Sequence, residues 1–305
     1  MSGWRACLLT ICLAAVGCSA KPKTPIVIFL DGAGHFGYAG NVKQGLRQGG
    51  YAGRFESFVW TSLLGPGVDH LLAARVGGHA AGLARKINRI RASDSADPIH
   101  LIGLSSGTAV LMAALERLEN GVMVDNVVLL SSSISARRDL SRMLRRVRGH
   151  VYVTTSLHDG MLAMLAVNAD GGGGPPAGRV GALQPRTLAR SDRDLYRKVV
   201  NLPWRPAYAG YGWNGGHVRV TSPRFIEAVI LPRLRSNDLF PLDRPVHREP
   251  YVSDVPHPRT RLSIYGVASP LVGGAPAFLV THKGRRYIGD DHGRVNRQPG
   301  TVAGW

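Results

Sequence analysis

The chain has 305 residues, of which 38 are lysine or arginine and 20 are aspartate or glutamate, so the formal net charge at pH 7 is +18. This length accommodates one α/β domain of ordinary size with an extension. All three cysteines lie within the first 18 residues, which excludes an internal disulfide or a cysteine-ligated metal in the rest of the chain. The net charge favours anionic partners, but it specifies no chemistry, and no specific nucleic acid is expected.

Residues 1–17 are predicted to be a signal peptide. Arg5 precedes an apolar stretch, Ala6 to Val16, that is too short to span a bilayer as a helix, and small residues lead up to Cys18. The segment resembles a bacterial lipoprotein signal. The resemblance implies that Cys18 is acylated and that residues 18–25 tether the protein to the cell envelope, with the outer membrane favoured over the inner because Ser19 follows. An ordinary secretory signal is the alternative.

Strand-like and helix-like segments alternate over the next two hundred residues. β-branched or apolar runs indicate strands at 26–31, 54–60, 99–103, 127–133 and 150–156. Helical spacing indicates helices at 70–90, 108–118, 136–148 and 225–231, the last introduced by Ser222 and Pro223. Alternation of this kind predicts a mostly parallel sheet with helices on both faces.

The sequence GLSSG, residues 103–107, lies between the third of these strands and its helix. A strand that turns sharply into a helix between glycines can expose one serine hydroxyl, here that of Ser105. In a chain with 38 glycines the five residues alone are weak evidence. The interpretation of Ser105 as a nucleophile therefore depends on residues downstream.

Two downstream residues have the required chemistry, because a serine needs a histidine to take its proton and the histidine needs an acid to orient it. Asp159 follows the strand at 150–156, where a sheet of this class presents its chemistry. His217 lies on a loop before the last helix. Asp192 and Asp194 remain alternatives for the acid, although neither follows an evident strand. No H-E-x-x-H pattern is present, so no metal is expected.

Ser105, Asp159 and His217, in this order, resemble the nucleophile, acid and base of the α/β-hydrolase superfamily, and the match covers residues 26–235. The glycine loop after the first strand resembles the family's oxyanion loop. The resemblance implies a serine hydrolase of the carboxylesterase or lipase type that cleaves carboxylic esters or thioesters through an acyl-enzyme. It also implies that the amides of Ala33 and Ser106 bind the oxyanion and that no cofactor is needed. A non-catalytic envelope lipoprotein that binds an anionic partner is the alternative.

A competing motif uses the same loop. The segment from Gly32 to Gly37 is a complete G-x-G-x-x-G after a strand, and Glu56 lies at the distance that a dinucleotide fingerprint requires. Glu56 falls early in its strand, however, and an exported protein meets little nicotinamide cofactor. An oxidoreductase is therefore the less favoured hypothesis.

Three further segments carry predictions. In 136–148, Leu140, Met143, Leu144 and Val147 form an apolar helical face, and the arginines off that face are candidate contacts for anionic lipid or lipopolysaccharide: Arg137, Arg138, Arg142, Arg145 and Arg146. Residues 160–213 are predicted to be an insert, either a lid or acyl-binding wall or simple surface packing. Residues 236–305 are predicted to be a proline-rich, β-rich extension, where residues 290–292 suggest either a metal ligand group or a solvated turn.

Overall fold

The computed structural model describes residues 23–34, 36–61, 66–72, 77–165 and 167–235, and the backbone of three strands near the C-terminus. The chain divides into two units, Met1–Val246 and His247–Trp305. The predicted signal peptide, the acylation of Cys18 and the suggestion at residues 290–292 lie outside the described residues. The lipid anchor and the envelope location therefore stay predictions of the sequence.

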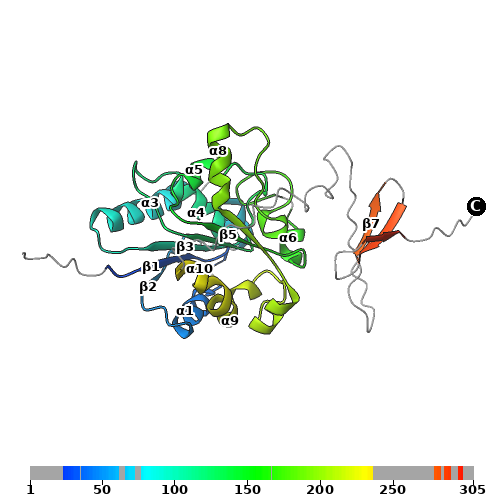
Figure 1. Cartoon of the computed structure of the whole chain (residues 1–305), viewed down its shortest axis with the longest axis horizontal. Coiled ribbons are helices and arrows are strands. Elements are labelled where there is room, and N and C mark those ends of the chain that lie inside the picture. The colour runs from blue at the N-terminus through cyan, green and yellow to red at the C-terminus, as the bar shows by residue number, and fades with distance from the viewer. Residues whose placement is uncertain are drawn as a thin grey trace, which may run out of the picture. The chain divides into compact units, whose positions relative to one another are not determined.

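The first unit is built on a sheet of six strands in the order β2-β1-β3-β4-β5-β6 (Figure 1). The strands are β1 (Ile26–Leu30), β2 (Arg54–Ser57), β3 (Ile99–Leu104), β4 (Val127–Leu130), β5 (Val151–Thr155) and β6 (Val199–Pro203). Every neighbouring pair is parallel. All residues of β1, β3, β4 and β5 are buried, as expected where both faces of a parallel sheet are covered. The predicted α/β fold class is confirmed.

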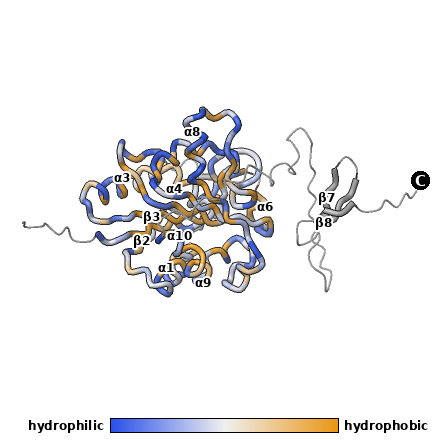
Figure 2. The backbone as a smooth tube through the Cα atoms, viewed as in Figure 1, coloured by the Kyte–Doolittle hydropathy of each residue, from blue (hydrophilic) through white to orange (hydrophobic). Residues whose placement is uncertain are grey.

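Helices cover both faces of this sheet. One layer holds α1 (Ala39–Gln48), α9 (Pro223–Phe225), the π-helix η4 (Ile226–Ile230) and α10 (Leu231–Arg235), and Figure 1 shows it below the sheet. The other holds α3 (Gly77–Ala92), α4 (Gly107–Leu115), α5 (Ser141–Leu144) and α8 (Arg190–Leu195). Alternate residues of β1 divide between the two layers: Val27 and Phe29 join one apolar cluster, and Ile28 joins the other. Figure 2 shows apolar residues along the central strands and polar ones on α8.

Several short elements connect the layers. They are α2 (Pro66–Leu72), α6 (Gly160–Ala163), α7 (Ala177–Val180) and the 3-10 helices η1 (Tyr196–Lys198), η2 (Pro206–Tyr211) and η3 (Arg219–Thr221). No helix in the described part of the chain is long and apolar enough to cross a membrane.

The helices differ from the predictions in two places. Where a helix was predicted at 70–90, the described residues are helical over Pro66–Leu72 and over Gly77–Ala92, and residues 73–76 lie outside the described residues. The helix predicted at 136–148 is reduced to α5, although its four apolar residues are all buried. Ser222 is the N-cap residue before Pro223 as predicted, but its hydroxyl donates to the carbonyl of Tyr211 and caps no helical N–H.

Strand β6 was not predicted, and it lies inside the predicted insert. Only two of its five residues are buried, and it contains Asn201 and Pro203, so it lacks the continuous apolar run of the central strands. The second unit contains an antiparallel sheet of β7 (Phe278–His282), β8 (Arg285–Gly289) and β9 (Val295–Arg297), which agrees with the β-rich character predicted there.

Candidate active site

Ser105 occupies a strained turn directly after β3. Its φ is +50°, in the left-handed region that residues other than glycine rarely adopt. Both backbone polar groups are held: its N–H donates to the carbonyl of Leu130 at 2.9 Å, and its carbonyl accepts from the Thr108 N–H at 3.0 Å. The Thr108 hydroxyl also donates to this carbonyl, at 2.5 Å. The turn is therefore fixed by β4 on one side and by α4 on the other, as a nucleophile elbow requires.

The glycines around this turn allow close backbone contact with the loop after β1. A Cβ added to Gly107 would lie 2.4 Å from the carbonyl oxygen of Asp31, so any side chain there would displace the backbone. A Cβ on Gly32 would lie 3.5 Å from the Cβ of Ser105. The predicted oxyanion loop and the serine turn are therefore in direct contact.

His217 and Asp159 are joined by a hydrogen bond of 2.8 Å between Nδ1 and Oδ2. Both side chains are buried, Asp159 completely. The other oxygen of Asp159, Oδ1, accepts from the N–H of Leu162 at 2.9 Å, since Asp159 is the N-cap residue of α6. Because the carboxylate faces Nδ1, this nitrogen carries the ring proton and leaves Nε2 as a proton acceptor.

The two alternative acids lie elsewhere. Asp192 forms an ion pair with Arg145, and Asp194 is exposed, 3.9 Å from Arg197. The structure brings Asp159 to His217 and brings neither of these aspartates there.

A glycine allows the histidine loop to approach the aspartate loop. Gly215 has φ +87°, and a Cβ placed on it would lie 2.9 Å from Oγ of Ser156 and 3.0 Å from Cβ of His158. Both residues lie within the three positions before Asp159. A side chain at Gly215 would therefore separate the two segments that carry His217 and Asp159.

The aromatic residues before His217 pack beneath its loop. Trp213 is fully buried, and its indole N–H donates to the carbonyl of Gly216 at 3.2 Å. The Trp204 indole donates to the carbonyl of Trp213 at 2.8 Å, and Tyr208 stacks on the Trp213 ring at 5.8 Å. For residues 160–213, a lid or acyl-binding wall and simple packing were the two interpretations. The contacts of Trp204 and Trp213 are those of packing.

Arg179 is a charged neighbour of Asp159 that belongs to no motif in the sequence. Burial lowers the pKa of its guanidinium, and the charge of Asp159 opposes that effect. Its Nη2 donates to the carbonyl of Leu157 at 3.3 Å. Arg179 therefore brings a positive charge within electrostatic range of Asp159.

Backbone N–H groups of the loop after β1 are hydrogen-bonded to the side chain of Asp31, the first residue of that loop. The buried carboxylate of Asp31 accepts the N–H groups of Gly32 at 2.8 Å, Gly37 at 3.1 Å and Tyr38 at 3.0 Å. A pyrophosphate at this helix start would meet a carboxylate instead of open amides. Glu56, the other half of the dinucleotide pattern, forms an ion pair with Lys86 at 2.5 Å. Both observations oppose the dinucleotide hypothesis.

The two predicted oxyanion donors belong to the loop after β1 and to the serine turn. Ala33 is half-buried in the loop after β1, and Ser106 is buried at the start of α4. The amide of Ser106 is among the first N–H groups of a helix, which have no partner within the helix. The hydroxyl of Ser106 lies 2.7 Å from Nδ1 of His70.

The arginine cluster is partly neutralised within the protein. Arg138 pairs with Glu116 at 3.3 Å, Arg145 with Asp192, and Arg146 donates to the carbonyl of Glu119 at 3.0 Å. Arg137 and Arg142 are exposed. Within the described residues, no group of three or more histidine, cysteine, aspartate or glutamate side chains could hold a metal ion.

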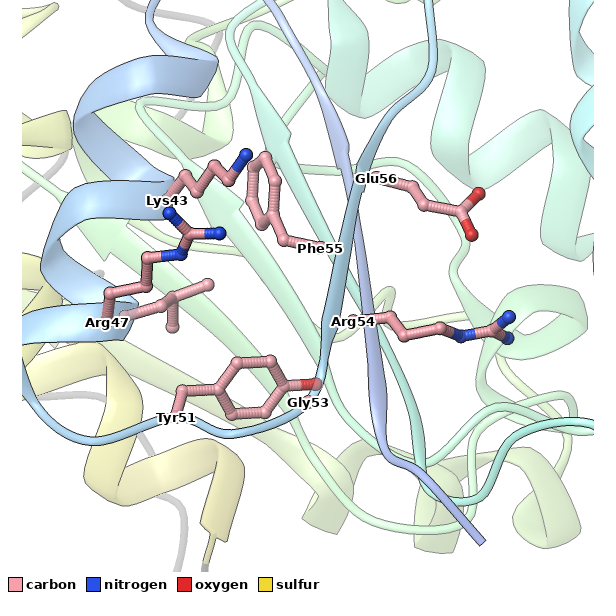
Figure 3. A pocket seen from close by; sticks show the side chains of 8 residues that line it. Lys43, Arg47, Tyr51, Gly53, Arg54, Phe55 and Glu56 are labelled. Carbon is pink, nitrogen blue, oxygen red and sulfur yellow. The ribbon is translucent and has the colours of Figure 1, made fainter.

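A cavity of about 330 Å³ lies between α1 and β2 (Figure 3). Lys43 and Arg47 of α1 face Tyr51 and Phe55, whereas Arg54 points away on the other side of the strand. None of the catalytic residues predicted from the sequence lines this cavity.

No protein-family model and no curated protein matches the sequence. Among solved structures, an esterase of Pyrococcus furiosus is 12% identical, with 70% of this chain and 82% of that chain covered and a TM-score of 0.41. Esterase PE8 is 16% identical over 64% of this chain and 85% of its own, with a TM-score of 0.41. The ydeN product of Bacillus subtilis is 14% identical over 69% and 99%, with a TM-score of 0.39.

The fold follows from the chain's own topology: six parallel strands between two helical layers, a serine on a strained turn after β3 and an aspartate after β5. This chain has the architecture of the α/β-hydrolase superfamily.

Proposed function

We propose that the protein is a serine hydrolase that cleaves carboxylic esters or thioesters. The observation that supports this most is the buried 2.8 Å hydrogen bond between His217 and Asp159. Asp159 lies at the same edge of the sheet as Ser105. Ser105 follows β3 and Asp159 follows β5, and the carboxyl ends of parallel strands meet at one edge.

The proposed reaction has two halves. The Ser105 oxygen attacks the carbonyl carbon while Nε2 of His217 takes the hydroxyl proton, and the amides of Ala33 and Ser106 hold the oxyanion. The bond to the leaving alcohol or thiol then breaks, and His217 donates the proton to it. Water attacks the resulting acyl-enzyme with His217 again as base, which releases the acid and restores Ser105.

Exposed apolar side chains in the segments that follow β1 and β5 favour a substrate with an apolar acyl group. Phe36 follows β1, and Met161 and Met164 follow β5; their exposed fractions are 64%, 57% and 86%. Methionine adapts its shape to apolar ligands. Esters with a medium or long acyl chain are therefore the favoured substrates.

Labelling with a fluorophosphonate tests the proposal directly. Wild-type protein should be labelled, Ser105→Ala should not, and Asp159→Asn should react on the order of 10⁴-fold more slowly because the histidine tautomer is no longer fixed. Asp192→Asn is the matched control and should react at the wild-type rate. Folded wild-type protein that resists the label, or Ser105→Ala that accepts it, contradicts the proposal.

A second candidate function is non-catalytic binding of an anionic partner. The cavity between α1 and β2 favours it, since Lys43 and Arg47 approach the cavity from one helix face. Binding to phosphatidylglycerol vesicles that is salt-sensitive, is lost in Lys43→Ala and survives in Ser105→Ala, with no ester turned over by the wild type, would establish this function instead.

A further inference from the structure

His70 of α2 is hydrogen-bonded on both sides of its ring. Nε2 lies 2.8 Å from the carbonyl oxygen of Val167, and Nδ1 lies 2.7 Å from Oγ of Ser106. A carbonyl oxygen only accepts hydrogen bonds, so Nε2 carries the proton of the neutral ring, and Nδ1 accepts from the Ser106 hydroxyl. Ser106 is 1% exposed, and His70 is partly buried.

The residue before His70 holds the loop after β1. Asp69 is 2% exposed, and its Oδ2 accepts the N–H of Gly34 at 3.0 Å. A Cβ added to Gly34 would lie 3.1 Å from Cβ of Pro66, so the start of α2 also packs on this glycine. Helix α2 therefore contacts the loop after β1 at two points.

Two consecutive residues of α2 thus secure the two segments that carry the proposed oxyanion donors. Asp69 fixes the peptide that directly follows Ala33, and His70 fixes Ser106. We propose that Asp69 and His70 are positioning residues that set the distance and direction between the Ala33 and Ser106 amides. The inference rests on the proposed hydrolase function, and both side chains would act through the segments that they hold.

The chemical reason is preorganisation. Amides stabilise a developing oxyanion only when they already point to the place that it will occupy, because reorientation during the reaction cancels the gain. Loss of one donor commonly costs on the order of 10² to 10³ in kcat, so a donor that is loosened and not lost should cost less. The bond to Val167 also joins this side of the site to the segment that follows α6, whose N-cap residue is Asp159.

The test uses four single variants of the full chain. His70→Ala removes both ring hydrogen bonds, Ser106→Ala removes one of them without changing α2, and His70→Asn returns an acceptor near the position of Nδ1. His79→Ala, at an exposed position of α3, is the matched control. Each variant is assayed for kcat and KM with a p-nitrophenyl ester, for the inhibition constant of a trifluoromethyl ketone, whose enzyme adduct carries the oxyanion, and for Tm.

In His70→Ala we expect kcat to fall by roughly 10- to 100-fold with KM changed less than about threefold, a fraction of the loss of a whole donor. Affinity for the ketone should fall by the same factor as kcat/KM, since both depend on the oxyanion. His70→Asn should recover part of this loss. Combining His70→Ala with Ser106→Ala should add little, because both remove one shared bond.

Three results would overturn the inference. One is kinetics of His70→Ala and Ser106→Ala equal to those of His79→Ala. Another is a loss of ketone affinity that is smaller than the loss of kcat/KM and follows the fall in Tm, which would make α2 merely structural. The third is wild-type protein without Ser105-dependent turnover, which removes the proposed function as well. The first two leave that function intact, so the failures are distinguishable.

Discussion

Gly215→Ala isolates the contact that brings the histidine loop to the aspartate loop. The φ of +87° is unfavourable for alanine by about 1–2 kcal/mol. The new methyl group would also lie 2.9 Å from Oγ of Ser156 and 3.0 Å from Cβ of His158, distances at which one segment must retreat. Strain and crowding together predict a loss of unfolding free energy of about 1–3 kcal/mol.

The displacement of either segment should lower the catalytic rate more than the stability. It would lengthen the 2.8 Å hydrogen bond between His217 and Asp159, and a misplacement of about 1 Å near a reacting group lowers the rate on the order of 10²-fold. The assay is kcat/KM with an activated ester, alongside urea unfolding. Gly210→Ala is the matched control, because nothing lies within 4 Å of a Cβ there and its φ is not positive; it should stay within about 0.5 kcal/mol.

The two measurements separate the parts of this reasoning. Unchanged stability would mean that the positive φ and the close approach do not constrain Gly215. Reduced stability with wild-type kcat/KM would mean that the loop contact is real but does not position His217. Either result refutes the claim that this glycine sets the geometry of the pair.

Two further predictions concern His100 of β3 and Gly107 of the serine turn that follows this strand. Burial lowers the pKa of His100 from 6.5 to about 4, against the opposing charge of Asp125, so the unfolded state binds a proton before the folded state does as the pH falls. The free energy of unfolding then decreases between about pH 6.5 and pH 4, by about 2 kcal/mol at pH 5. His100→Leu should not show this decrease when urea unfolding is measured at pH 7 and pH 5. If the free energies of unfolding of variant and wild type differ by the same amount at both pH values, the prediction is contradicted. Gly107→Ala should abolish fluorophosphonate labelling of Ser105, because its methyl group would lie 2.4 Å from the Asp31 carbonyl oxygen. Gly40→Ala in α1 is the control and should be labelled normally, because no atom lies within 4 Å of a Cβ there. Equal labelling of both variants would show that the close approach of Gly107 to Asp31 is not required.

Four of the five predicted strands are buried on both faces. Runs such as residues 26–30 and 127–130 are continuous and rich in β-branched or leucine side chains, and the structure buries every residue in them. The edge strand β2 was also predicted, although none of its residues is fully buried, because the predicted run, residues 54–60, includes aromatic side chains typical of strands. The other edge strand of the described sheet, β6, was not predicted, because it contains Asn201 and Pro203 and only two of its five residues are buried.

At the candidate site, the order of Ser105, Asp159 and His217 was readable because each follows or precedes a recognisable element. Asp69 and His70 were not readable, because their partners lie 35 and 36 positions away and belong to no motif. The glycine pattern after β1 was ambiguous for a related reason. Backbone amides that would bind a pyrophosphate and amides that bind the chain's own Asp31 require the same glycines, and only the fold distinguishes them.

The abundance of glycine, which made the GLSSG pattern weak evidence, has a physical use at this edge of the sheet. The segments after β1, β3, β4, β5 and β6 approach one another at glycines: a Cβ on Gly107 would lie 2.4 Å from the Asp31 carbonyl oxygen, one on Gly178 2.5 Å from the amide nitrogen of Ser132, and one on Gly215 2.9 Å from Oγ of Ser156. At the first two contacts the facing atoms are backbone, so no flexible side chain can move aside, and the positions of Ser105, Asp159 and His217 depend on the packing of whole segments. Substitutions at these glycines should therefore disturb the site as much as substitutions of the polar residues themselves.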